Sequence, residues 1–305
     1  MPLLECVPNV SEGRRPEVVA ALARTAASPG VTLLDVSSDP DHDRTVLTLA
    51  GEPEPLHEAL LGLYAEAVAA IDLTRHRGVH PRVGAVDVVP FVPLAGATMA
   101  EAVAAALRLA EAVAARFELP VFLYEEAARR AERRRLPDLR RGGFEGLPAR
   151  LADPAWEPDF GPPRLHPTAG ATIIGARPFL IAFNALLETG DPALARRIAS
   201  RVRESAAGGL PAVRAIGVYL ESRRRAQVSM NLLDFRRTSL TAALERVRRE
   251  AEALGTCVVA SEIVGLVPEE ALLGALREAL LLERFDADLV LERRLERAGG
   301  VTGAR

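Results

Sequence analysis

The residues best suited to chemistry lie between positions 76 and 93, which read HRGVHPRVGAVDVVPFVP. This segment holds two of the five histidines, together with two arginines and two glycines, and it leads into an apolar run. His80 can change its charge near neutral pH, so it is suited to proton transfer. A polar loop that enters a buried strand would hold such a group rigidly at a cleft. We predict that His80 is a general acid or base, with a purely structural histidine as the alternative.

His76 and His80 are four residues apart, a spacing that on a helix would suit a metal ion. Gly78 lies between them and Pro81 follows, so a helix is disfavoured here. The segment offers no cysteine and no second carboxylate as further ligands. We therefore predict that the protein uses no metal.

Arg82 and Asp87 are the charged residues closest to His80 on its C-terminal side. Arg82 could bind a substrate carboxylate through its guanidinium fork, or it could pair with Asp87 or with another acid of the protein. Asp87 lies in an expected strand, where a carboxylate is costly unless it is paired. It could orient His80, as an acid orients the base of a catalytic triad, or it could pair with Arg82. No serine or cysteine nucleophile lies in this motif, so covalent catalysis is not indicated.

Two other charged segments allow more than one interpretation. Residues 41–44 read DHDR and lie between two expected strands, where they would form a solvated turn or part of a site. Residues 125–135 contain five arginines and three glutamates. We interpret them as a helix face with ion pairs, with attraction of an anionic ligand as the alternative.

The composition is that of a soluble globular protein. The 305 residues are 49% hydrophobic and 26% charged, and the net charge of −3 argues against broad nucleic-acid binding. No apolar run is long enough to cross a bilayer, and no secretion signal is evident at the start of the sequence. We therefore expect a cytoplasmic protein, in which Cys6 and Cys257 are reduced core residues.

The sequence contains no lysine, because all 38 basic residues are arginine. Schiff-base and pyridoxal-phosphate chemistry therefore lack their amine, and a Walker A loop lacks its lysine. Side-chain amides are scarce too, so each one is a candidate for a specific polar role.

Apolar periodicity divides the chain into two similar halves. In the first half it predicts strands at 3–7, 31–36, 45–50, 86–92 and 121–124, and helices at 17–27, 56–70 and 98–117. In the second half it predicts strands at 179–186, 213–220, 227–233 and 256–260, and helices that begin at 191 and near 240. The order β-α-β-β-α-β occurs twice, which is typical of ferredoxin-like folds. We predict an α/β (α+β) fold of two lobes, 1–177 and 178–305, each a mixed sheet with helices on one face.

Residues 136–170 differ from both halves, because they contain seven prolines and the only tryptophan. Trp156 and Phe160 favour an ordered segment that docks on the protein, with an ordinary linker as the alternative. The tail from 272 to 295 has a mostly helical pattern, in which 287–291 could form a strand.

Several blocks of the sequence resemble the formiminotransferase domain of the glutamate formimidoyltransferase family. Residues 5–13 (ECVPNVSEG) resemble the start of that domain, and 80–91 (HPRVGAVDVVPF) match its most characteristic motif. Later blocks are 156–162 (WEPDFGP), 170–177 (GATIIGAR), 179–184 (FLIAFN), 227–235 (QVSMNLLDF) and 264–268 (VGLVP). The matches follow one another in order over nearly the whole chain.

The resemblance implies transfer of a formimino group from N-formimino-L-glutamate to N5 of tetrahydrofolate, in histidine degradation and one-carbon metabolism. It implies that His80 is the catalytic histidine, and Asp87 and Arg82 would support it. Tetrahydrofolate would be a co-substrate, and the partners would be small molecules rather than nucleic acid or a membrane. The resemblance also suggests a homodimer. The cyclodeaminase domain of the animal enzyme is not present in this sequence, so a separate cyclodeaminase would act next.

The resemblance also implies which residues bind the substrates. The folate site would be formed by Gly161, Pro162, Pro163, Arg164, Leu165, His166, Pro167, Thr168, Ala169 and Gly170. Other substrate-binding candidates are Asn9, Arg44, Asn184, Gln227 and Asn231.

Three positions depart from the family pattern. Val10 stands where the family usually has Phe, Val79 where it has Glu, and Asp43 where it has Asn. The change at Val79 removes a carboxylate beside His80 and could alter the preferred donor. Formyl transfer or 5-formyl-folate scavenging on the same fold, and a folate-binding protein without turnover, are therefore alternative functions.

Overall fold

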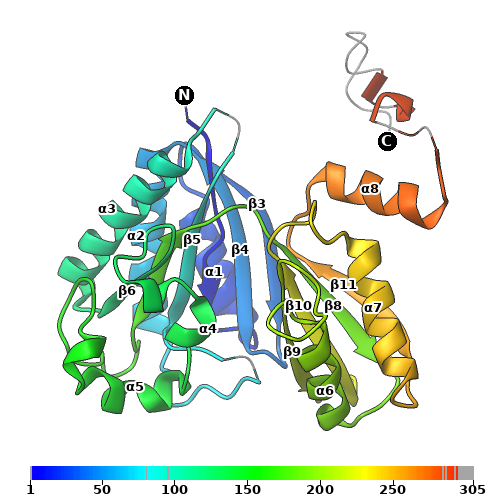
Figure 1. The fold of residues 1–305 in the computed structure, drawn as a ribbon. Helices are drawn as coiled ribbons and strands as arrows, with labels where there is room; N and C mark the ends of the chain where they lie inside the picture. Colours follow the sequence, from blue (N-terminus) through cyan, green and yellow to red (C-terminus); the bar gives the residue numbers. More distant parts are fainter. Residues whose placement is uncertain are drawn as a thin grey trace. The chain divides into compact units, whose positions relative to one another are not determined.

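A computed structural model describes residues 2–79, 81–94, 96–283, 285, 287–291 and 293–294 (Figure 1). The chain divides into two compact units, each with its own sheet. The first unit contains residues 1–179 and 220–223, and the second contains 180–219 and 224–305.

The first unit is built on a seven-stranded mixed sheet. Its strands are β1 (Leu4–Cys6), β2 (Asn9–Val10), β3 (Val31–Asp39), β4 (Arg44–Gly51), β5 (Val86–Pro93), β6 (Val121–Glu125) and β7 (Thr172–Ala176). β1 and β2 both lie between β4 and β5, and β3 pairs with β4. All of these pairings among β1 to β5 are antiparallel, and the strands have the predicted ferredoxin-like order. β7 and then β6 extend the sheet beyond β5 in parallel pairings.

Strand β7 is an element that the periodicity did not predict. It has only five residues and contains Gly175, which weakens a strand pattern. A Cβ atom at Gly175 would lie 2.3 Å from the carbonyl oxygen of Tyr124 on β6, so the close approach of the two strands requires glycine. Gly175 therefore weakens the strand pattern in the sequence, but the pairing of β7 with β6 requires it.

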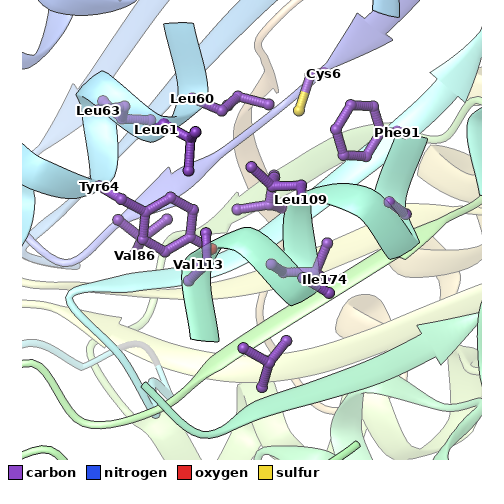
Figure 2. Close-up of a cluster of buried hydrophobic side chains, with 14 of the residues drawn as sticks. Cys6, Leu60, Leu61, Leu63, Tyr64, Val86, Phe91, Leu109, Val113 and Ile174 are labelled. Atoms are coloured by element: carbon purple, nitrogen blue, oxygen red, sulfur yellow. The ribbon is translucent and has the colours of Figure 1, made fainter. Parts of the chain in front are cut away.

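Helices α1 (Pro16–Ala26), α2 (Pro53–Ala70) and α3 (Met99–Phe117) pack on one face of this sheet. The first turns of α1 and α2 contain proline, and α3 has the predicted capping box between Thr98 and Glu101. In Figure 2, Leu60 of α2 and Leu109 of α3 lie in one apolar cluster with Phe91 of β5. This core holds β5, and hence the segment that precedes it, in a fixed place.

The proline-rich segment is ordered, as predicted, and its leucines pack on the face of the sheet opposite the helices. It contains short helical elements that were not predicted: η1 (Ala131–Arg133), α4 (Leu136–Leu139), α5 (Gly143–Leu151) and η2 (Pro154–Trp156). Leu147 and Leu151 join Phe122 and Tyr124 of β6 in a second apolar cluster, and Trp156 packs against it.

The prediction of an arginine-rich helix face over 125–135 is wrong. Only a 3-10 turn forms there, and Arg133 is 1% exposed. Its guanidinium lies 3.1 Å from the Asp159 carboxylate and donates to the carbonyl oxygen of Glu157 at 2.6 Å. Because Arg133 points inward, its charge joins the turn to the end of the proline-rich segment. The exposed Arg134 pairs with Glu126 at 2.7 Å, as an ion pair on a solvated face would.

The second unit is a four-stranded sheet in the order β11-β8-β10-β9. Its elements are β8 (Ile181–Leu187), α6 (Pro192–Val202), β9 (Val213–Leu220), β10 (Arg225–Leu232), α7 (Leu240–Glu252), β11 (Val258–Val264) and α8 (Glu269–Ala279). This is the predicted ferredoxin-like order. The ladders that β8 forms with β10 and β11 are antiparallel, whereas the parallel pairings β5–β7 and β6–β7 lie in the first unit. The reason is that each helical crossover of the ferredoxin-like order skips one strand position.

Two expectations for the second unit are wrong. Residues 287–289 form a 3-10 turn (η3, Ala287–Leu289) rather than a strand, closed by a local bond from Val290 N–H to the Ala287 carbonyl. Cys257 is exposed because it precedes the edge strand β11, whereas Cys6 is fully buried as predicted. Within the described part of the chain, no helix is both long and apolar enough to cross a bilayer.

Replacing Arg133 with Met should leave the buried Asp159 carboxylate without its cation. We expect the free energy of unfolding, measured by urea denaturation, to fall by about 3–5 kcal/mol. The matched variant Arg134→Met breaks the exposed pair with Glu126 and should cost less than about 1 kcal/mol. Equal small losses in the two variants would contradict the role assigned to Arg133.

Candidate active site

The candidate residues of this unit lie at one end of its strands. We call this end, at which β4, β5 and β7 begin, the edge of the first sheet. The parallel strands β5 and β7 begin at this edge, so the segments 76–85 and 161–171 that precede them both lie there. β2 is antiparallel to β5 and β4 is antiparallel to β2, so β4 also begins there, with Arg44. The topology therefore brings together Arg82, Asp87, Arg44 and the end of the 161–170 loop. Asn184, Gln227 and Asn231 belong to the second unit.

The segment before β5 is fixed against the turn between β3 and β4. His76 is buried, and its Nε2 donates to the carbonyl oxygen of Asp43 at 2.8 Å. A Cβ atom at Gly78 would lie 2.2 Å from the carbonyl oxygen of His42, so only glycine fits there. His80 lies outside the described residues, and its orientation stays a prediction. The contacts of His76 and Gly78 hold the backbone that leads to it.

Asp87 is the extra residue of a β-bulge. Val10 pairs with Val86 and Asn9 with Val88, so Asp87 has no partner in the ladder. Its carboxylate is nearly inaccessible to water and is aimed back at the preceding loop. Oδ1 accepts a hydrogen bond from Val83 N–H at 2.7 Å.

The cation that pairs with Asp87 is Arg140, at the end of α4, which the sequence analysis did not single out. The alternative that Asp87 pairs with Arg82 is therefore wrong. Arg82 instead donates to Oε1 and Oε2 of Glu145 at 2.8 and 3.2 Å. This interaction lowers the pKa of Glu145. The sequence signal for both partners is weak, because they lie more than 50 residues away along the chain.

Arg44 is a third guanidinium near Asp87. Removal from water, followed by the charge of Arg140, lowers the pKa of Arg44 to about 9, although Asp87 and Asp39 act in the opposite direction. Arg44 therefore stays protonated at neutral pH. The arrangement concentrates positive charge at this edge of the sheet, which suits anionic substrates.

Two hollows adjoin the 76–82 segment, and both are lined by His76 and Arg82. The smaller has a volume of about 10 Å³, roughly enough for one water molecule, and it is also lined by Ser11, Arg44 and Asp87. The larger is an open depression of about 510 Å³, also lined by Leu73, Arg77, Phe144 and Glu145. Its volume lies within the range of sites for small organic molecules.

The 161–170 loop reaches the depression at one end only. At its start, Arg164 pairs with Glu118 at 2.8 Å, close to the end of α3. At its end, the carbonyl oxygen of Thr168 accepts from Leu73 N–H at 2.8 Å. A Cβ atom at Gly170 would lie 3.0 Å from the Leu73 side chain. The first residues of the predicted folate loop are therefore more distant from the 76–82 segment than the last.

His166 has a defined protonation state in this loop. Its Nδ1 accepts hydrogen bonds from Ala169 N–H at 3.0 Å and from Thr168 N–H at 3.4 Å. Burial lowers the pKa of His166, so the ring is neutral at pH 7 and carries its proton on Nε2. The loop therefore presents a hydrogen-bond donor rather than a cation at this position.

The amide candidates have distinct surroundings. Asn9 donates to the carbonyl oxygen of Val7 at 2.8 Å, and its Oδ1 is buried with no hydrogen-bond partner among the described residues. In the second unit, Asn184 and Gln227 both donate to Oε1 of Glu262, at 3.1 and 3.0 Å. Glu262 was not predicted, because the strand that carries it has no recognisable motif. Asn231 lies on β10 with Gln227.

The metal hypothesis for His76 and His80 is not tested, since His80 is outside the described residues. Among the residues that the structure does describe, no three histidine, cysteine or acidic side chains are grouped to hold a metal ion. The absence of a metal stays a prediction.

Replacing Asp87 with Leu should free the loop from its anchor. Leucine has a similar size, but it cannot accept from Val83 N–H and leaves the largely buried Arg140 without a counterion. We expect a loss of about 3–5 kcal/mol in unfolding free energy and faster hydrogen exchange of the Val83 amide. Unchanged protection of Val83 would show that Asp87 does not hold this loop.

The lowered pKa of His166 gives a pH dependence with a definite sign. The unfolded chain takes up a proton near the ordinary value of 6.5, whereas native His166 resists it. The stabilising contribution is therefore complete above about pH 6.5 and is lost as the pH falls through the native pKa. An NMR titration should place the His166 pKa below 6.5. The stability advantage over His166→Gln should shrink on acidification; a constant advantage would argue against this assignment.

Comparison with known proteins covers both units. The model for the N-terminal subdomain of the formiminotransferase domain matches residues 3–177, and that for the formiminotransferase domain matches residues 182–284. The glutamate formimidoyltransferase of Streptococcus pyogenes serotype M1 is 45% identical over 93% of this chain and 95% of its own length. That of Thermoplasma acidophilum is 42% identical over 99% of this chain and 100% of its own length.

Fused relatives are also similar. The formimidoyltransferase-cyclodeaminase of Sus scrofa is 49% identical over 90% of this chain, which spans about half (51%) of that longer protein. The two family models and the stand-alone relatives agree with the motifs around the edge of the first sheet, and they establish that this chain belongs to the formiminotransferase family.

Proposed function

We propose that the protein transfers a formimino group from N-formimino-L-glutamate to N5 of tetrahydrofolate, which gives 5-formimino-tetrahydrofolate and glutamate. The observation that carries this proposal is the arginine-lined edge of the first sheet, where the segment containing His80 adjoins a depression of suitable size. Family membership supports the same reaction.

In the proposed reaction, N5 attacks the amidine carbon of the donor and the bond from that carbon to the glutamate nitrogen breaks. N5 must lose a proton, and the leaving nitrogen must gain one. A histidine can accept the first proton and return it to the second atom, because imidazole titrates near neutral pH. We assign this role to His80. Asp87 accepts a hydrogen bond from Val83 N–H and thereby shapes the loop that contains His80.

Both substrates carry carboxylates, and a protein without lysine must bind them through arginine or backbone N–H groups. Arg82 and Arg44 are the proposed carboxylate-binding groups of the first unit. Leu73 and Phe144 form an apolar wall that suits the pterin ring. Residues 161–170 are proposed to contact the folate, and the amides Asn9, Asn184, Gln227 and Asn231 to contact substrate.

The remaining features of the proposal concern the protein as a whole. Residues 1–177 and 178–305 would be the two subdomains of a cytoplasmic homodimer that uses tetrahydrofolate as co-substrate and no metal. It would act in histidine degradation and one-carbon metabolism. The fused relatives support a separate cyclodeaminase as the next enzyme.

Formyl transfer is a second candidate function, and Val79 is the observation that favours it. This side chain is 43% exposed beside His80, at a position where the family usually has glutamate. A formyl donor lacks the basic amidine that a carboxylate at this position would attract. Valine at this position therefore removes an attraction that would favour the formimino donor over a formyl donor.

Replacing His80 with Asn should remove proton transfer but leave substrate binding intact. We expect kcat for transfer from formimino-glutamate to fall by about 10²- to 10⁴-fold, with little change in the Kd for 5-formyl-tetrahydrofolate. His57→Asn in α2, away from both hollows, should keep full activity. Parallel assays with formyl-glutamate identify the preferred donor. Full transfer by the His80 variant would refute the mechanism, and folate binding without any transfer by the wild type would indicate a binding protein.

A further inference from the structure

The guanidinium of Arg82 is engaged by a carboxylate of the protein itself. Two nitrogen atoms of Arg82 face the two oxygen atoms of Glu145, at 2.8 and 3.2 Å. This is the paired geometry in which arginine binds carboxylates most specifically. Both residues line the open depression, so the pair lies where a ligand would enter.

The two partners of this pair differ greatly in exposure. The side chain of Arg82 is 12% exposed, whereas that of Glu145 is 65% exposed. An ion pair with one partner largely in water is weak, because water solvates that partner nearly as well when it leaves. Arg82, by contrast, would remain mostly buried without a carboxylate. Glu145 can therefore leave the pair at little cost in free energy. Arg82 without any carboxylate partner would be costly, so another carboxylate can take the place of Glu145.

The backbone around Glu145 suits such an exchange. Glu145 lies in the first turn of α5, two residues after Gly143, and both Gly142 and Gly143 have positive φ. Glycine can change its backbone conformation at low cost, so the start of this helix can adjust. A carboxylate in a first helical turn is also favoured by the helix dipole, so Glu145 keeps a stabilising contact after it leaves Arg82.

Arg77 adds a second cation to the same depression. Its guanidinium donates to the carbonyl oxygens of Thr74 and His76, at 3.2 and 2.9 Å, so the loop itself holds it in place. Two arginines and one glutamate leave a net positive charge in the depression, and this charge attracts an anion.

We propose that Glu145 occupies the position of a substrate carboxylate on Arg82, and that a ligand carboxylate binds at Arg77 and Arg82 by displacing it. This inference rests on the proposed function for its ligands, which are the glutamyl carboxylates of the formimino donor or of the folate tail. Glu145 is a positioning residue that sets how readily a carboxylate enters. No covalent step is involved, since one carboxylate replaces another.

The variant Glu145→Gln removes the competing charge but keeps the size of the side chain. With glutarate as a probe of the donor side, we expect the inhibition constant to fall about threefold. On the folate side, 5-formyl-tetrahydrofolate is compared with 5-formyl-tetrahydropterin, which lacks the glutamyl tail. Tighter inhibition by glutarate that is competitive with the formimino donor assigns the position to the donor, and tighter binding of the tailed folate but not of the pterin assigns it to the co-substrate.

Two controls keep the test specific. Glu126→Gln breaks a similar exposed pair with Arg134 in the same unit and should change neither constant. In the Arg82→Gln background, whose folding is checked by circular dichroism, the Glu145 substitution should have no further effect. The inference is overturned if Glu145→Gln leaves both constants unchanged, weakens binding, or tightens it equally without Arg82. A wild-type protein that binds glutarate but transfers no formimino group would refute the proposed function instead.

Discussion

Asp87 places a carboxylate where almost no water reaches it, and the loop that precedes β5 takes its shape from that charge. A buried carboxylate is tolerated only when hydrogen-bond donors and a cation surround it. The bulge in β5 aims Asp87 at Val83 N–H rather than into the apolar core, and Arg140 approaches from α4. Asp87 thereby joins the end of the segment that contains His80 both to β5 and to Arg140 at the end of α4.

The proline-rich segment supplies much of what surrounds this loop. Arg140, Phe144 and Glu145 all come from the short stretch where α4 ends and α5 begins. The buried pair of Arg133 and Asp159 ties that segment to the edge of β6. A region whose composition suggests a linker therefore acts as one wall of the candidate site, because its charges are matched to partners in the sheet and the adjoining loop.

The sequence predicted most of what depends on neighbouring residues. Periodicity and the Thr98 cap identify the repeated β-α-β-β-α-β order, because each signal is contained within one element. It could not identify the cations that pair with Asp87 and Asp159, since those choices depend on which distant segments meet. Strand β7 could not be predicted for a similar reason, because Gly175 is required only by the close approach of Tyr124 on the neighbouring strand. The role of His80 stays a prediction from its motif.

The close contact of Gly84 with Gly170 joins the two loops of the candidate site. A Cβ atom at Gly84 would lie 1.8 Å from the carbonyl oxygen of Ala171, and one at Gly170 would lie 2.2 Å from that of Val83. With backbones so close, neither loop can shift without moving the other. Two ligands that each contact a different loop would therefore change each other's binding affinity. Such a linkage is reciprocal, because each ligand changes the affinity for the other by the same factor.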